Sequence, residues 1–170
     1  KPIVLSSDEP YRFLTYDGTT VPPVLPTYEY SIVVSSFSKS LSIAGERIGY
    51  IAVNPDMQGV DGLLNGIILA NRILGFVNAP IIGQYIVEKA LGSGVDVAIY
   101  DERRRAMAAI LDAVRLQYTM PKGAFYFFPQ APAGFDDVEF VDLLMSENII
   151  AVPGAGFGYP GYFRLAFCVD

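Results

Sequence analysis

The first third of the chain holds three short apolar runs, and each run ends in polar or turn-forming residues. The runs, with the residues that close them, are Ile3 to Leu5 before Ser6-Ser7-Asp8, Ile32 to Val34 before Ser35-Ser36, and Ile48 to Val53 before Asn54-Pro55. Short apolar runs bounded in this way indicate buried strands. The stretch VPPVLP at residues 21–26 fits an extended loop, because proline interrupts regular structure.

The middle of the chain, from about residue 56 to residue 115, has the pattern of helices. Asn78-Ala79-Pro80 predicts a helix start with the asparagine as cap, and that helix would end at Gly92. Residues 96–115 predict one long helix, because apolar residues recur on one of its faces.

After Tyr118 the pattern changes to short strands around one helix. Residues 124–128 predict a strand, 137–146 a helix capped by Asp136 or Asp137, and 149–152 and 162–169 two further strands. The fold class is therefore α/β. Residues 1–95 would form part of a larger domain, 96–117 a connecting helix, and 118–170 part of a smaller α+β domain. The chain starts and stops within strand-like runs, so we expect it to be incomplete at both ends.

Composition excludes several classes of function. The net charge of −6 argues against nucleic acid, which requires a basic face. Without histidine, imidazole cannot ligate a metal or serve in a serine–histidine hydrolase mechanism, and we expect no metal site. The single cysteine, Cys168, suits a reducing compartment and hence the cytoplasm. No apolar run is long enough to predict a membrane span.

Candidate chemistry gathers where the first two predicted strands end. Asp8 and Tyr11 follow the first strand, Ser36 and Lys39 follow the second, and Arg47 precedes the third. Each residue alone has a commoner role, in a turn, in packing or in a surface ion pair. Together they would converge on one crevice if the two strands are neighbours, because ligands bind at the carboxyl ends of strands in open α/β sheets.

This set of groups is what pyridoxal phosphate requires. The cofactor needs a lysine amine for a Schiff base and a carboxylate opposite its pyridine nitrogen. Arginine and serine hydroxyl groups suit its phosphate, and a tyrosine suits its ring hydroxyl.

Four segments resemble the class I/II aminotransferases, the aspartate aminotransferase-like, fold type I enzymes that depend on pyridoxal phosphate. The segment SFSKSLSIAGERIGY (36–50) resembles their cofactor-lysine signature, and SDEPYRFLTYDG (7–18) resembles the aspartate-x-x-tyrosine segment upstream of it. PKGAFYFFP (121–129) is similar to the hairpin of their small domain. VPGAGFGYPGYFRLAF (152–167) is similar to the segment that ends in the substrate-carboxylate arginine. The segments occur in family order.

The resemblance implies a role for each candidate of the first 50 residues. Lys39 would form the Schiff base and move the proton between substrate and cofactor. Asp8 would pair with the pyridinium nitrogen and Tyr11 would bond the ring oxygen, while Ser36 and Arg47 would hold the phosphate.

The resemblance also implies the substrates and the assembly. Arg164 would bind the α-carboxylate of the amino acid, whose amino group passes to a 2-oxo acid, and the enzyme would be a homodimer. The chain would be the C-terminal portion: the second half of the large cofactor domain, followed by the small C-terminal domain. The glycine-containing phosphate cradle, the stacking aromatic residue and an asparagine of the site would lie outside it, so we expect the fragment alone to be inactive.

Three alternatives to the aminotransferase remain open from the sequence. A C–S lyase or decarboxylase of the same fold would use the same cofactor residues. A noncatalytic aminotransferase-like domain could instead bind an effector within a transcription regulator. A protein-interaction module with chance matches is a third, weaker alternative.

Overall fold

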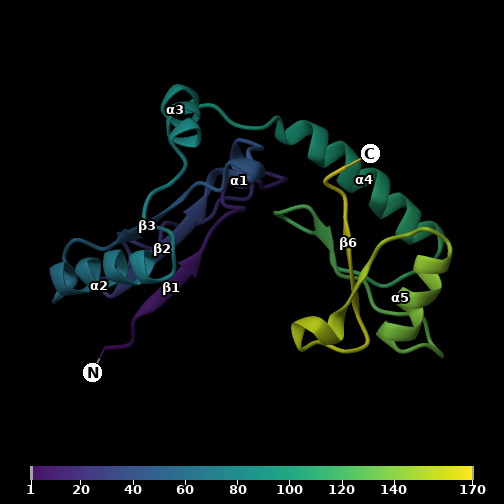
Figure 1. Ribbon diagram of the computed structural model, residues 1–170. Coiled ribbons are helices and arrows are strands. Elements are labelled where there is room, and N and C mark those ends of the chain that lie inside the picture. Colours follow the sequence, from purple (N-terminus) through teal and green to yellow (C-terminus); the bar gives the residue numbers. More distant parts are fainter. Residues whose placement is uncertain (1, 170) are drawn as a thin grey trace. The chain divides into compact units, whose positions relative to one another are not determined.

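A computed structural model describes residues 2–169, which form two compact units (Figure 1). The first unit comprises Lys1–Leu14 and Thr20–Val95, and the second comprises Thr15–Thr19 and Asp96–Asp170. The chain therefore leaves the first unit for five residues, returns to it, and leaves it again at residue 96. In the described part of the chain, no helix has both the length and the apolar character that crossing a bilayer requires.

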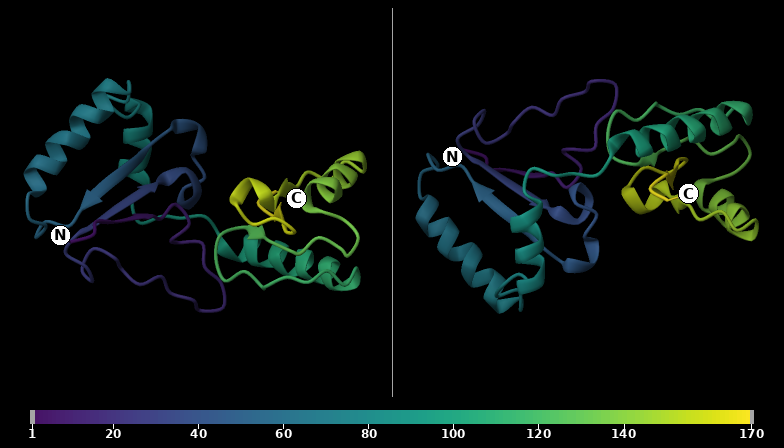
Figure 2. Two further views of the ribbon diagram at one scale, coloured as in Figure 1. Left: turned by 90° about the horizontal axis from the view of Figure 1, so that it is seen from below. Right: turned by 90° about the horizontal axis from the view of Figure 1, so that it is seen from above.

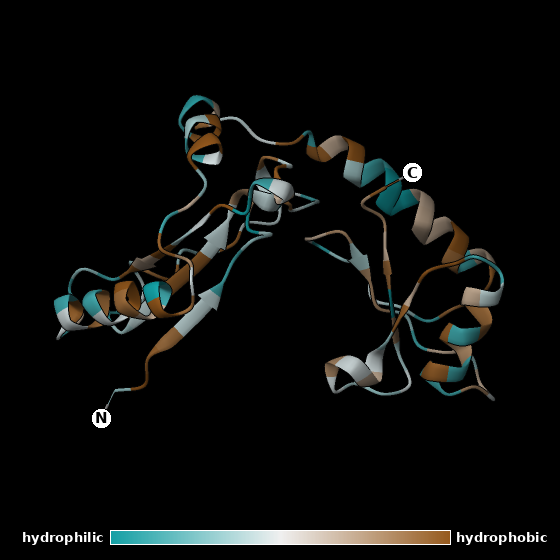
Figure 3. Ribbon diagram, in the orientation of Figure 1, coloured by the Kyte–Doolittle hydropathy of each residue, from teal (hydrophilic) through white to brown (hydrophobic). Residues whose placement is uncertain are grey.

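The first unit is built on a three-stranded sheet of order β1-β2-β3. Strand β1 (Leu5–Asp8) runs parallel to β2 (Ser31–Ser36), and β3 (Gly49–Val53) runs antiparallel to β2. Along β1 the residues change from apolar to polar toward the carboxyl end (Figure 3). This sheet confirms the mixed α/β class and the second and third predicted strands. The third strand is not buried as predicted, because Tyr50 and Ile51 are 42% and 41% exposed.

The first predicted strand and the predicted helix cap at residue 78 need correction. The first strand begins at Leu5, where pairing with β2 begins, and Ile3 is 81% exposed rather than buried. Helix α3 (Ile81–Ala90) follows Pro80 as its N-cap, and no side chain caps it. The helix starts here because the ψ of 132° at Pro80 is not helical, and the amide of Gln84 donates to the carbonyl oxygen of Pro80 at 3.0 Å.

Helices and a pinned loop complete the first unit. Strand β2 leads into the single-turn helix α1 (Phe37–Ser40), and a 3₁₀ turn η1 (Ala44–Glu46) precedes β3. Helix α2 (Val60–Ile73) lies beside the sheet, and its Leu64 and Ile68 line a hollow together with Ile51. The buried amide of Asn54 donates to the carbonyl oxygens of Leu25 and Tyr28, which fixes the proline-rich loop.

The second unit places two helices against a small antiparallel sheet (Figure 2). The sheet has the order β4-β6-β5. Its elements are α4 (Val97–Ala113), β4 (Tyr126–Phe127), α5 (Asp137–Ser146), β5 (Val152–Pro153), a 3₁₀ turn η2 (Gly154–Phe157) and β6 (Phe163–Ala166). Asp136 caps α5 in a reciprocal capping box with Glu139, which confirms one of the two predicted caps.

Strand β5 begins later than the sequence predicts. Asn148 adopts a positive φ of 63°, and the amide of Ile149 closes the end of α5 on the carbonyl oxygen of Leu144. Residues 149–150 therefore lie between the end of α5 and the start of β5, and Ile150 is 84% exposed.

Aromatic residues from β4 and β6 supply the core of the second unit. Phe127 and Phe163 are 0% and 1% exposed, and Phe167 packs on Phe127 at a ring distance of 5.5 Å. Leu111 of α4 and Val141 of α5 are also buried. Aromatic side chains of this size bury a large apolar area and thereby stabilise the small sheet.

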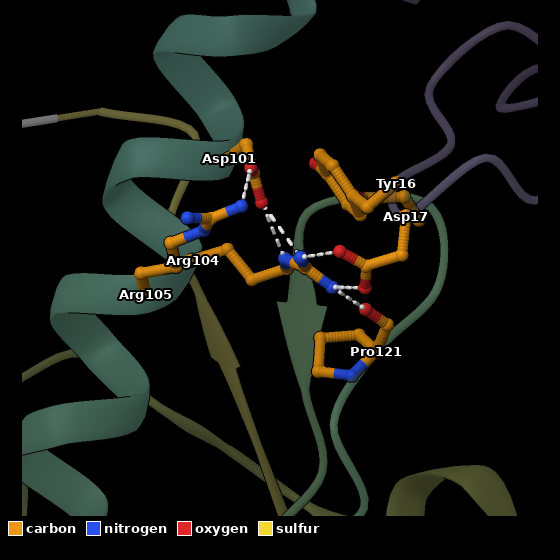
Figure 4. A network of polar contacts seen from close by, with 7 residues as sticks. Tyr16, Asp17, Asp101, Arg104, Arg105 and Pro121 are labelled. Carbon is orange, nitrogen blue, oxygen red and sulfur yellow. Dashed lines mark hydrogen bonds and ion pairs between the residues drawn. The ribbon is translucent and has the colours of Figure 1, made fainter.

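A buried arginine joins the five-residue excursion to α4 within the second unit (Figure 4). The guanidinium of Arg104 donates from Nη1 and Nη2 to the two carboxylate oxygens of Asp17, at 2.8 and 2.9 Å, and from Nε to Asp101 at 2.8 Å. It also donates to the carbonyl oxygen of Pro121 and lies 4.5 Å from the ring centroid of Tyr16.

The same network changes the ionisation of its members. Hydrogen bonding by Arg104 lowers the pKa of Asp17 below its ordinary value. Burial raises the pKa of Tyr16 to about 12, and its hydroxyl donates to the carbonyl oxygen of Ala124 at 2.6 Å. Residues 15–19 are therefore held in the second unit by both charge and burial.

Candidate functional site

The carboxyl ends of β1 and β2 meet at one edge of the first unit's sheet. Asp8 is the last residue of β1 and Ser36 the last residue of β2, and the two strands are parallel neighbours. The register pairs Asp8 with Val34, so Asp8 lies on the same face of the sheet as Val34 and Ser36. Strand β3 starts at this edge too, because Gly49 pairs with Ser36.

Lys39 lies in the helical turn that follows β2, close to the residues that follow β1. Its Nζ is 5.9 Å from the centroid of the Tyr11 ring, and both side chains are half-buried. Tyr11 in turn lies three residues beyond Asp8. The structure therefore brings Asp8, Tyr11, Ser36 and Lys39 to a single edge of one unit.

Arg47 occupies a sharp turn just before β3. Its φ of 50° is left-handed, a conformation that few residues with a side chain adopt. The side chain is exposed, and Nη1 donates to the carbonyl oxygen of Ala44 at 2.8 Å. The remaining donors of the guanidinium fork can still bind an anion.

A glycine is required where β3 leaves this turn. A Cβ at Gly49 would lie 2.5 Å from the backbone oxygen of Ser35, closer than real Cβ contacts. The glycine therefore allows β2 and β3 to approach at the edge where Ser36 and Lys39 follow.

Arg164 lies in β6 of the second unit, between two aromatic rings. Its guanidinium carbon is 4.6 Å from the centroid of Tyr126 and 4.7 Å from the centroid of Phe157. Among residues 2–169, no carboxylate forms an ion pair with it. An arginine held by stacking, with its charge unneutralised, is suited to binding an external carboxylate.

Sequence reasoning missed the polar contacts that surround the Asp8–Tyr11 turn. The Glu9 carboxylate accepts hydrogen bonds from Ser7 and Arg12, and the Ser35 hydroxyl donates to the Glu9 backbone oxygen. The available signal was the spacing of Glu9 and Arg12, which places opposite charges three residues apart directly after a strand. These contacts stabilise the turn itself, and none of them is a contact to a ligand.

The groups at this edge fit pyridoxal phosphate. Asp8 is exposed, and no described residue forms an ion pair with its carboxylate, so the oxygens can accept from a pyridinium. The Ser36 side chain makes no cap bond to α1 and can donate elsewhere. Lys39 supplies the amine.

Comparison with known proteins identifies the family. The sequence model of one protein family, aminotransferase class I and II, matches residues 1–170. The chain therefore belongs to this family, whose members use pyridoxal phosphate. A (5-formylfuran-3-yl)methyl phosphate transaminase of Methanocaldococcus jannaschii is 32% identical over an aligned length of 172 residues, and the alignment covers 95% of this chain and 44% of that protein.

Solved structures agree with the family assignment. An aminotransferase from Eubacterium rectale matches with a TM-score of 0.92 and 38% identity, over 100% of this chain and 42% of that one. An α-aminoadipate aminotransferase from Thermus thermophilus matches with a TM-score of 0.80 and 25% identity, over 99% and 46%. That structure contains N-(5'-phosphopyridoxyl)-L-leucine, an adduct of the cofactor with an amino acid. The chain thus spans less than half the length of these relatives; that it is their C-terminal portion stays a prediction.

Proposed function

We propose that the chain carries the cofactor lysine and the substrate-carboxylate arginine of a pyridoxal-phosphate-dependent aminotransferase. The whole protein would transfer an amino group from an amino acid to a 2-oxo acid. The observation that supports this most directly is the gathering of Asp8, Tyr11 and Lys39 at one sheet edge, with Lys39 Nζ 5.9 Å from the Tyr11 ring. A homodimer in the cytoplasm stays a prediction from the family resemblance and the single cysteine.

Each residue at this edge has a defined task toward the cofactor. Lys39 Nζ would hold the cofactor covalently and, once released by substrate, move a proton to and from the substrate Cα. Asp8 would keep a proton on the pyridine nitrogen, and the Tyr11 hydroxyl would donate to the ring oxygen. When bound, pyridoxal phosphate supplies the electron sink for the bond broken at Cα.

Phosphate and carboxylate recognition would fall to other residues. The Ser36 hydroxyl and the Arg47 guanidinium can bind the phosphate through charge-assisted hydrogen bonds. Arg164 would bind the α-carboxylate of the substrate through its planar fork. The stacking rings of Tyr126 and Phe157 would hold that fork in a fixed orientation before the substrate arrives.

The test uses protein expressed from its whole reading frame and loaded with pyridoxal phosphate. Adding an amino donor should shift the cofactor absorbance band, and adding a 2-oxo acid should restore it, with the new amino acid appearing in the product. A transient shift that reverses without any 2-oxo acid, with release of a thiol, sulfide or carbon dioxide, would identify a lyase or a decarboxylase instead. A shift without any product would identify an effector-binding domain, and protein that binds no cofactor would contradict the proposal.

Arg164→Ala separates substrate binding from cofactor binding. Losing one charge-assisted contact to the carboxylate should weaken amino-acid binding about 10- to 100-fold. The cofactor content should not change. The matched control is Arg105→Ala, an exposed arginine of the same unit, which should leave both quantities unchanged. Loss of cofactor and amino acid together in Arg164→Ala would show that Arg164 is structural.

A further inference from the structure

In sequence, Glu9 lies between Asp8 and Tyr11, the two residues that would contact the cofactor ring, yet its side chain faces away from solvent. Its side chain is only 8% exposed, whereas its neighbour Asp8 is exposed. The carboxylate accepts one hydrogen bond from Ser7 Oγ at 2.9 Å and one from Arg12 Nη1 at 2.7 Å. Both carboxylate oxygens are therefore used within the turn.

The backbone of Glu9 is bonded to the end of the neighbouring strand. Its amide donates to the carbonyl oxygen of Val34 at 2.8 Å, and its carbonyl oxygen accepts from Ser35 Oγ at 3.0 Å. Val34 and Ser35 precede the turn that carries Lys39. Glu9 thus connects the chain on which Asp8 and Tyr11 lie to the chain on which Lys39 lies.

Arg12 extends the same set of contacts to a third segment. Its Nη2 donates to the carbonyl oxygen of Val21 at 2.8 Å, and Nη1 also reaches that of Pro22 at 3.3 Å. Residues 21 and 22 belong to the chain that returns to the first unit after the excursion at residues 15–19. Arg12, which is paired with Glu9, therefore connects the chain before the excursion to the chain after it.

We propose that Glu9 and Arg12 are positioning residues for the aminotransferase reaction, which hold the Asp8 carboxylate and the Tyr11 hydroxyl in register with Lys39. This inference rests on the proposed function. Neither residue touches the cofactor in the proposal. Their effect comes from geometry, because a displacement of about 1 Å in a positioned group can lower a rate by about 100-fold.

The experiment compares Glu9→Ala with Glu9→Gln, and with Glu88→Ala as a matched control. Glu88 is an exposed glutamate of the same unit, and within residues 2–169 its one ion pair is with Lys89. Glutamine keeps an oxygen that can accept from Arg12, so it should restore much of what alanine loses. The protein is expressed from its whole reading frame, with and without cofactor.

Two measurements distinguish positioning from general stability. Without cofactor, hydrogen–deuterium exchange of residues 8–14 should be faster in Glu9→Ala than in wild type, while exchange in α4 and α5 should not change. With cofactor, the pH midpoint of the absorbance change of the lysine-held cofactor should move in Glu9→Ala. In that variant kcat should fall at least about tenfold while the cofactor content stays equal.

Each outcome decides between the two proposals. Wild-type protein that binds no cofactor would refute the proposed function, and the inference with it. Wild-type protein that binds cofactor, with Glu9→Ala unchanged in exchange and in pH midpoint, would refute only the inference. If Glu9→Ala does not fold, Ser7→Ala, which removes one of the two donors, takes its place and should show the same changes at smaller size.

Discussion

Replacing Arg104 by methionine should destabilise the protein, because the buried guanidinium connects residues 15–19 to α4. Its side chain is 2% exposed, and it bonds Asp17, Asp101 and the carbonyl oxygen of Pro121. Breaking a buried ion pair by removing one partner costs about 3–5 kcal/mol. Asp17 keeps 51% of its side chain exposed and can regain water, so we expect about 3 kcal/mol, the lower end of this range.

Urea unfolding followed by circular dichroism measures this loss, and the neighbouring arginine provides the control. Arg105 is 68% exposed and pairs with the same Asp101, so Arg105→Met should change the free energy of unfolding by less than about 0.5 kcal/mol. Equal losses in both variants, or no loss in Arg104→Met, would show that the buried network does not stabilise the unit.

Three further predictions concern the second unit. Backbone amides of Gly161 and Ala155 lower the pKa of Asp137, so Asp137→Asn should be less stable than wild type at neutral pH. This difference in stability should disappear as pH falls through and below the ordinary value of 3.8, because Asp137 of the wild type then becomes protonated. A deficit that persists in acid would contradict this. Burial raises the pKa of Tyr16 from 10.0 to about 12, so wild-type stability should fall across that interval, and Tyr16→Phe should lack this part of the fall in alkaline unfolding curves. A Cβ at Gly154 would collide with the backbone oxygens of Tyr159 and Tyr162, so Gly154→Ala should lower the melting temperature, whereas Gly156→Ala, which meets no atom within 4 Å, should lower it less.

Local patterns predicted those elements whose hydrogen bonds are local or whose apolar face is continuous. The helix at residues 137–146 and its Asp136 cap follow from a capping residue followed by a periodic apolar stripe. The strands β2 and β3 follow from apolar runs that end in polar residues. In contrast, Ile3 and Val4 have the composition of a strand but no strand opposite them, so composition alone placed the first strand two residues too early.

The excursion at residues 15–19 could not be predicted, because its partners are distant in sequence. Tyr-Asp-Gly has the composition of a simple turn, and the residue that holds Asp17 is 87 positions away in α4. The buried arginine itself lies in a charged run that, by sequence, resembles a solvated helix face. Only the fold shows that Arg104 is buried while Arg103 and Arg105 are not.

The candidate site, too, was predictable from the sequence only in part. That Asp8 and Lys39 could share a sheet edge follows from the rule that parallel neighbouring strands end together, and the pairing of β1 with β2 agrees with it. The three-residue spacing of Glu9 and Arg12 was a signal for their ion pair, but the bonds of Arg12 to the backbone oxygens of residues 21 and 22 leave no pattern in the sequence and were not predictable.

The most direct test of the whole account is to locate the covalent bond to the cofactor. Protein expressed from its whole reading frame is loaded with pyridoxal phosphate, reduced with borohydride and digested. The masses of its peptides are then measured by mass spectrometry. We predict the added mass on the peptide that contains Lys39, and no added mass in Lys39→Ala. Added mass on Lys89 or Lys122, or undiminished labelling of the alanine variant, would contradict the account.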